Sequence, residues 1–267
     1  MTKTWLPLSI LVGLVLVLAP PAWSDFQAGL RAYNRGDYAA ALKEFQPLAG
    51  QGHAEAQFHL GTMYFKGQWV PQDYEGAARW FRLAAQQGNE SAQILLGAMY
   101  ANGQGVLQDD GEAIKWYRLA AEQGLALAQY NLGYRYEKGL GVPQDFQEAV
   151  RWFQRAADQG DVSAQYYLGY MYAEGLGVPQ DYGEALRWFW ASAEQGDASA
   201  QYYLGYMYAN GLGVWRNTIQ AYMWVTVSAA QGFENAEKGQ EFLEKKMTPN
   251  EITEAQRLAQ EWKPKKP

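Results

Sequence analysis

The sequence repeats itself every 36 residues, and this period constrains the fold more than any other feature. Gln-Gly pairs recur at this step from Gln51-Gly52 to Gln231-Gly232, and Leu-Gly pairs recur from Leu60-Gly61 to Leu204-Gly205. Tryptophans follow the same period at Trp80, Trp116, Trp152, Trp188 and Trp224. No insertion or deletion interrupts the series, so each unit is one structural module in an array of stacked repeats.

Within a unit, the apolar residues follow helical spacing. Ala56, Leu60 and Tyr64 are four residues apart, and the segment 77–84 has apolar residues at i, i+3, i+4 and i+7, both of which are helical periods. In later units the second segment begins with an aspartate, such as Asp109, and an acidic residue follows three positions later. This spacing is the pattern of a capping box. The sequence therefore predicts two helices per unit and an all-α solenoid of helix-turn-helix repeats.

The Leu-Gly pair places a glycine inside the first helix of every unit. An interior glycine costs about 1 kcal/mol relative to alanine, so it needs a compensating contact. We expect that Gly61 lets the second helix approach closely through its small Ala77 and Ala84, and that the tryptophan fills the remaining space. On this hypothesis Trp152→Ala destabilises the protein by about 3 to 5 kcal/mol.

The repeat motif resembles a known family. Residues 92–116 read Ala-Gln-x-x-Leu-Gly-x-Met-Tyr-x-x-Gly-x-Gly-Val-x-Gln-Asp-x-x-x-Ala-x-x-Trp, which is similar to the Sel-one-like repeat (SLR) family of the tetratricopeptide-like helical repeats. Two units depart from the motif: Trp69 replaces a loop glycine, and Arg135 replaces the methionine. The resemblance implies a right-handed superhelix whose concave surface binds other proteins. It also implies a scaffold, adaptor or regulator rather than a catalyst, and for secreted bacterial members a link to envelope regulation or host interaction.

The chain divides into four parts around these repeats. Residues 1–24 are predicted to be a signal peptide, 25–52 a shorter tetratricopeptide-like unit, 53–232 the five repeats, and 233–267 capping helices with a basic tail. The sequence Thr248-Pro249-Asn250-Glu251 supplies an N-cap, a first-turn proline and a capping-box acid for the last helix. Caps of this kind shield the terminal apolar faces of a solenoid.

The first 24 residues have the pattern of a secretory signal. Lys3 precedes an apolar run over 8–19, and small residues at Ala22 and Ser24 suit cleavage after Ser24. The alternative is an uncleaved anchor, but the run falls short of the ~20 residues that span a bilayer. We therefore expect a mature chain from Asp25 that is periplasmic or secreted, with no stable membrane anchor.

Composition excludes several kinds of chemistry. The chain has no cysteine and two histidines, and its 22 basic and 28 acidic residues give a net charge of -6, which argues against nucleic acid as a partner. His53 and His59 are six residues apart and cannot chelate a metal as an i, i+4 pair could. Residues 139–142 lack the third glycine of a dinucleotide loop. We expect no catalytic residue, no metal and no cofactor.

One face of the first helix varies between units while the core face does not. In the last three units this face is rich in tyrosine, which is favoured at recognition surfaces. The residues predicted to bind a partner are Asn131, Tyr134, Lys138, Tyr167, Tyr170, Glu174, Tyr203, Tyr206 and Asn210. The alternative, which the sequence leaves open, is that these tyrosines only pack one repeat against the next.

Two classes of function are consistent with the sequence. The first is a scaffold that binds a partner protein or peptide, such as an envelope enzyme or the ectodomain of a sensor kinase. The alternative is a module for cell-wall glycan or exopolysaccharide, in which exposed aromatic residues such as Trp69, Trp190 and Trp215 stack on sugar rings. Titration of the intrinsic fluorescence with peptidoglycan fragments distinguishes the two.

Overall fold

The computed structural model describes residues 25–265, so the predicted signal peptide lies outside the described residues. This part of the chain contains fourteen α-helices and no strand. The helices are α1 (Phe26–Asn34), α2 (Tyr38–Gly50), α3 (Ala54–Lys66), α4 (Tyr74–Gln86), α5 (Glu90–Asn102), α6 (Asp110–Glu122), α7 (Ala126–Lys138), α8 (Phe146–Asp158), α9 (Val162–Glu174), α10 (Tyr182–Glu194), α11 (Ala198–Asn210), α12 (Thr218–Ala229), α13 (Glu234–Glu244) and α14 (Pro249–Glu261).

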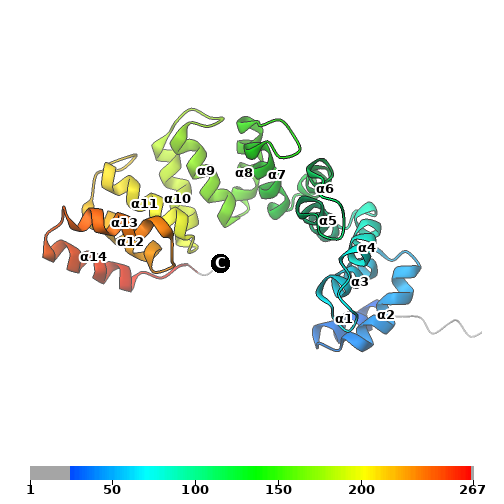
Figure 1. Cartoon of the computed structure of the whole chain (residues 1–267). Helices are drawn as coiled ribbons and strands as arrows, with labels where there is room; N and C mark the ends of the chain where they lie inside the picture. Colours follow the sequence, from blue (N-terminus) through cyan, green and yellow to red (C-terminus); the bar gives the residue numbers. More distant parts are fainter. Residues whose placement is uncertain (1–24, 266–267) are drawn as a thin grey trace, which may run out of the picture.

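The helices stack in chain order and form an arc, as Figure 1 shows. Consecutive helices from α1 to α13 pack against one another, whereas α14 packs on α12. In the middle of the arc α5 lies on the inner side and α6 on the outer side. The predicted all-α solenoid of paired helices is therefore confirmed.

The helix ends follow the sequence signals closely, with one correction. The last helix has the complete predicted capping box between Thr248 and Glu251. In the repeats the aspartate caps the second helix, as Asp109 does by accepting a hydrogen bond from the backbone N–H of Glu112 at 3.0 Å. The acid side chain does not reach back, because a basic residue three positions on pairs with it. These pairs are Glu112 with Lys115, Glu148 with Arg151 and Glu184 with Arg187.

The interior glycine allows close helix approach, as predicted, but the group opposite it is different. A Cβ atom added at Gly133 would lie 2.8 Å from the ring of Phe153 and 3.2 Å from the carbonyl oxygen of Ala149. The residue that follows each tryptophan, and not the tryptophan, occupies the space beside the glycine; it is an aromatic ring in the first four repeats and Val225 in the fifth. Trp152 is instead packed with Ile114 and other residues of α6 and α7, and only 9% of its surface is exposed. The tryptophan thus joins adjacent repeats, because neighbouring positions on a helix point about 100° apart.

A buried glutamine connects three helices in every repeat. Gln129 donates from Nε2 to the carbonyl oxygen of Ala121 in α6 at 3.1 Å. Its Oε1 accepts a hydrogen bond from Gln159, just after α8, at 2.7 Å. The same two hydrogen bonds recur at Gln57, Gln93, Gln165 and Gln201. This ladder gives a structural role to the glutamine of every Gln-Gly pair from Gln87-Gly88 to Gln231-Gly232.

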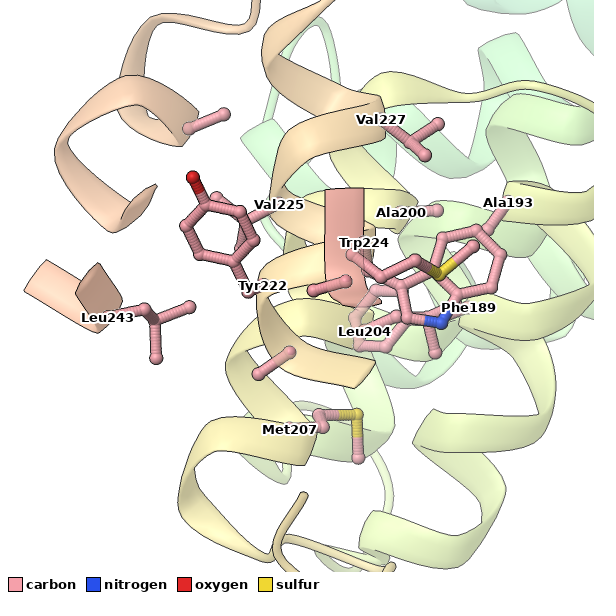
Figure 2. Close-up of a cluster of buried hydrophobic side chains, with 14 of the residues drawn as sticks. Phe189, Ala193, Ala200, Leu204, Met207, Tyr222, Trp224, Val225, Val227 and Leu243 are labelled. Atoms are coloured by element: carbon pink, nitrogen blue, oxygen red, sulfur yellow. The ribbon is translucent and has the colours of Figure 1, made fainter. Parts of the chain in front are cut away.

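The C-terminal end of the solenoid has the largest buried cluster (Figure 2). Trp224 lies on one side of α12, near Phe189 and Leu204, while Tyr222 and Val225 point to the opposite side, toward Leu243 of α13. Helices α13 and α14 both pack on α12, the second helix of the fifth repeat.

Candidate functional site

The nine predicted binding residues lie on three successive first helices, α7, α9 and α11, and the structure sorts them by position in the repeat. Three residues, Asn131, Tyr167 and Tyr203, occupy what we term the stacking position, which faces the preceding repeat. Three more form the tyrosine row, Tyr134, Tyr170 and Tyr206. The remaining three form the polar row, Lys138, Glu174 and Asn210.

The stacking position packs against the repeat before it. The ring of Tyr167 stacks on Phe153 with centroids 5.2 Å apart, and Tyr203 stacks on Phe189 with centroids 5.1 Å apart. Burial raises the pKa of both phenols, so they stay protonated at neutral pH. For these two tyrosines the structure shows packing between repeats, which was the alternative that the sequence left open.

The tyrosine row is less enclosed and lies at the surface. Tyr134 meets the edge of Tyr167 at 5.9 Å, and Tyr170 meets Tyr203 at 6.2 Å, each from the neighbouring repeat. Both are half-buried, whereas 50% of the surface of Tyr206 is exposed. Tyr206, at the C-terminal end of the row, is therefore the most exposed of the three.

The polar row is exposed on all three helices. Lys138 pairs with Glu137 at 2.8 Å, and its ammonium nitrogen lies 5.8 Å from the centroid of the Tyr134 ring. This hydrogen bond raises the pKa of Lys138. Asn210 donates from its side-chain amide to the carbonyl oxygen of Tyr206 at 2.8 Å.

Sequence reasoning missed Glu137, a buried acid beside this surface. Its side chain is almost fully covered, and its Oε2 has no hydrogen-bond partner in the described part of the chain. Three other repeats have alanine at this place, namely Ala101, Ala173 and Ala209. The departure from alanine was the signal available in the sequence.

Hollows accompany the surface at the C-terminal repeats. A cavity of about 200 Å³ lies between α9 and α11, and Glu174, Tyr203 and Tyr206 contribute to its lining. A larger one of about 390 Å³ lies between α11 and α13, lined in part by Tyr206, Asn210 and Phe242. Of the predicted site residues of the fifth repeat, Tyr206 therefore borders both hollows, Tyr203 only the smaller and Asn210 only the larger of the two.

Helix α13 extends the same surface by one more unit, which the sequence analysis did not anticipate. Phe242 lies 36 residues after Tyr206, and Lys246 lies 36 residues after Asn210. Phe242 is 56% exposed, and the ammonium of Lys246 lies 3.8 Å from the centroid of its ring. Continuing the 36-residue count beyond the fifth repeat would have found both residues.

The aromatic residues outside the repeat pattern are not all exposed. Trp215 is 93% exposed and Trp69 is 70% exposed, the latter with φ of 63°. Trp190 contradicts the expectation, because it packs edge-on against Trp224 with centroids 4.9 Å apart. The next ring, Trp262 of the C-terminal segment, covers Trp224 at 5.6 Å, so Trp190 and Trp262 complete the terminal core.

The two histidines have separate surroundings. His53 caps α3 by accepting a hydrogen bond from Ala56 at 3.2 Å, whereas His59 is enclosed by aromatic rings, among them Phe45 at 5.0 Å. In residues 25–265 no group of three His, Asp or Glu side chains is placed to hold a metal ion. No helix in that range is long and apolar enough to cross a membrane.

Comparison with known proteins shows that the repeats match a known repeat family. The family model described as Sel1 repeat matches five consecutive segments, residues 54–89, 90–125, 126–161, 162–197 and 198–233. The chain is 33% identical to a Sel1 repeat protein from Oxalobacter formigenes, with a TM-score of 0.79 over 88% of this chain and 98% of that chain. No curated protein matches it.

A second solved structure shows the same fold. This is a protective antigen of uropathogenic Escherichia coli with an SLR fold, which is 36% identical and has a TM-score of 0.78. The match covers 88% of this chain and 52% of that protein, so the chain spans about half of that protein's length. The two structures and the five matched segments confirm the resemblance found in the sequence.

Proposed function

We propose that the protein is a non-enzymatic scaffold of the bacterial envelope. The basis is that the chain belongs to the Sel1 repeat family, whose members are generally scaffolds for protein–protein interaction. Its partner is a protein or peptide, such as an envelope enzyme or a sensor ectodomain. The partner binds along the first helices of the last three repeats, across the tyrosine row and the polar row.

The observation that carries this proposal is the difference between neighbouring positions on the same helices. Tyr203 stacks on Phe189 and is needed for packing between repeats, whereas Tyr206, three residues later, is half exposed and borders two hollows. A large amphipathic ring that packing does not require is favoured at a recognition surface.

The signal-like pattern of residues 1–24 supports export to the periplasm or beyond. Export is tested by expressing the full chain in a bacterial host and measuring the mass of the protein recovered from the periplasm and the medium. A mass that corresponds to cleavage after Ser24 supports the proposal. A full-length chain that stays with the cytoplasmic fraction contradicts it.

The binding surface is tested by photo-crosslinking. A photoreactive phenylalanine analogue replaces Tyr206 or Tyr170, and in a matched control it replaces Leu119, an exposed residue of the second helix α6. We expect a discrete protein adduct in envelope fractions at the two tyrosine positions and not at Leu119. Identical adducts at all three positions would place the partner elsewhere.

The glycan alternative has less support from the structure. Trp69 and Trp215 lie on loops of the first and fifth repeats, at opposite ends of the arc, so they cannot stack on one sugar ring. Titration with peptidoglycan fragments is expected to leave the tryptophan fluorescence unchanged. A saturable change that is lost in Trp215→Ala would favour glycan binding instead.

A further inference from the structure

In four of the five repeats the stacking position brings a side chain of the first helix against an aromatic ring of the preceding second helix. His59 stacks on Phe45 with centroids 5.0 Å apart, and Leu95 belongs to the cluster that contains Phe81. Tyr167 and Tyr203 continue the series in the fourth and fifth repeats. In these four repeats, the inserted side chain fills the junction between neighbouring units.

At α13 the series is interrupted. The stacking position is Gly239, 36 residues after Tyr203, and the residue opposite it is Val225 rather than an aromatic ring. Without a side chain at Gly239, a hollow of about 390 Å³ opens between α11 and α13. Tyr202, Tyr206 and Phe242 contribute its aromatic walls.

The two rings on either side of this hollow are unusually exposed. Tyr206 is 50% exposed and Phe242 is 56% exposed, although they occupy equivalent positions on consecutive first helices. In the preceding pair of repeats, the equivalent Tyr170 contacts the stacked ring of Tyr203. The junction at α13 thus lacks the ring that covers its neighbours elsewhere in the solenoid.

The charge around the hollow is positive, in contrast to the chain as a whole. Lys238 lines the hollow, and Arg216 and Lys246 line an adjoining one of about 210 Å³ that shares Asn210, Phe242 and Leu243 with it. No acidic residue lines either hollow. None of these three cations forms an ion pair within residues 25–265, while the whole chain carries a net charge of -6.

The positive region has a defined border. Glu174 lines the next hollow, between α9 and α11. On α13 itself four acids are exposed but line neither of the two positive hollows, namely Glu234, Glu237, Glu241 and Glu244. A ligand at Gly239 therefore meets an aromatic-walled space with cations along its α13 side.

We propose that the hollow between α11 and α13 binds an acidic peptide segment that inserts one aromatic or large aliphatic side chain between Tyr206 and Phe242. The inserted side chain supplies the group that Gly239 lacks, and acidic residues of the peptide pair with Lys238, Lys246 and Arg216. Buried anchors in pockets carry most of the affinity at interfaces, and complementary rim charges steer association. The inference rests on the proposed scaffold function and specifies the partner's chemistry.

A random dodecapeptide library selected on purified residues 25–267 tests this proposal. We expect enriched sequences that combine several Asp or Glu residues with a Phe, Tyr, Trp or Leu. Binding of these peptides to K238E/K246E is expected to weaken about tenfold or more. The control K43E/K66E makes the same charge change at two exposed lysines near the other end of the solenoid and is expected to bind normally.

A double-mutant cycle locates the anchor. Phe242→Ala in the protein and replacement of the aromatic residue of the peptide by alanine are each expected to weaken binding about tenfold. Both changes together should weaken binding by less than the product of the two separate factors, because they remove the same contact. Circular dichroism and the urea midpoint of each variant check that α13 is folded. Enrichment of basic or uncharged peptides, no enrichment, or equal loss in both charge variants would overturn the proposal.

The outcome is separable from that of the scaffold proposal. Crosslinks at Tyr170 and Tyr206 without selected acidic peptides refute the hollow as a peptide site and leave the scaffold function standing. Selected peptides that obey the cycle, without any envelope adduct, support the hollow and contradict the proposed partner interaction.

Discussion

Gln159 donates a hydrogen bond from Nε2 to Oε1 of Gln129 at 2.7 Å, and through it the end of one repeat is joined to the interior of that repeat's first helix. Gln129 in turn donates to Ala121 of the preceding repeat at 3.1 Å. The pattern recurs in all five repeats. In each one, side-chain amides therefore join the first helix to the end of its own second helix and to the preceding unit.

Removing this buried amide is expected to destabilise the solenoid. Gln129→Ala removes the hydrogen bonds to Ala121 and from Gln159, and at about 0.5 to 1.5 kcal/mol for each bond we expect a cost of about 1 to 3 kcal/mol. Urea denaturation followed by circular dichroism measures the change. Gln147→Ala, at an exposed position of α8, is the control and should change stability by less than about 0.5 kcal/mol.

Gly133→Ala is expected to destabilise the protein although alanine favours helices. The new methyl group would lie 2.8 Å from the Phe153 ring, and overpacking of about 1 to 3 kcal/mol outweighs the gain of about 1 kcal/mol in helix propensity. Gly50→Ala, where no atom lies within 4 Å of the new group, should be neutral or stabilising. Combining Gly133→Ala with Phe153→Leu should show coupling, and simple additivity would contradict this contact.

Trp152→Ala is expected to cost about 3 to 5 kcal/mol, because it empties the space between the third repeat and α6. Trp215→Ala removes the same side chain from a position that is 93% exposed and should leave the midpoint nearly unchanged. Thermal and urea unfolding of the two variants check this. Equal effects would mean that Trp152 does not bridge repeats.

The stability of the N-terminal end is expected to fall in acid through His59. Burial lowers the pKa of His59 below its usual 6.5, against a smaller opposite effect of Glu55. Below pH 6.5 the unfolded chain therefore binds a proton that the folded chain resists, so the free energy of unfolding decreases until the folded pKa is passed. The unfolding midpoint of the wild type should drop between pH 7.5 and pH 5.5.

His59→Phe keeps a ring on Phe45 but removes the titration, so its unfolding midpoint should depend less on pH in this range. The control is Gln147→Ala, an uncharged substitution at an exposed position of α8, which should retain the wild-type slope. A His59→Phe slope equal to that of the wild type would refute the role of His59.

Tyr203→Ala and Tyr206→Ala are expected to separate folding from binding. Tyr203 stacks on Phe189, so its loss should lower stability by about 3 kcal/mol or more. Tyr206 is half exposed, so its loss should lower stability far less and weaken binding of the crosslinked partner. A Tyr206→Ala variant that loses stability alone contradicts the assignment of the tyrosine row.

The local rules of the repeat were readable from the sequence because they depend on residues close together in the chain. The 36-residue period and the helical spacing predicted paired helices, and Thr248 with Glu251 predicted the capping box of α14. The predicted capping boxes of the repeats were only half right: the aspartate caps the helix, but the acid three residues on does not reach back. Lys115 and its equivalents compete for the carboxylates of these acids. That competition depends on side-chain rotamers, which spacing alone does not specify.

The sequence predicted which helix face forms the candidate surface, but not which residues on that face pack between repeats and which stay exposed. On an isolated helix Tyr203 and Tyr206 belong to the same stripe, yet Phe189 of the preceding repeat covers one and leaves the other open. Glu137 and the extension of the surface onto α13 were missed because a single unusual residue and a sixth, incomplete unit do not stand out in the repeat.

The sequence by itself determined the architecture: the number of repeats, two helices in each, their caps and the need for close approach at Gly133. Only the tertiary structure decided that Phe153 faces that glycine while Trp152 reaches the previous repeat. It also decided that Gly239 leaves a hollow at its junction, whereas Tyr203, at the equivalent position one repeat earlier, fills the junction there. The physical reason is that periodicity fixes which side of a helix a residue occupies, whereas burial and exposure depend on what the neighbouring repeat places against that side.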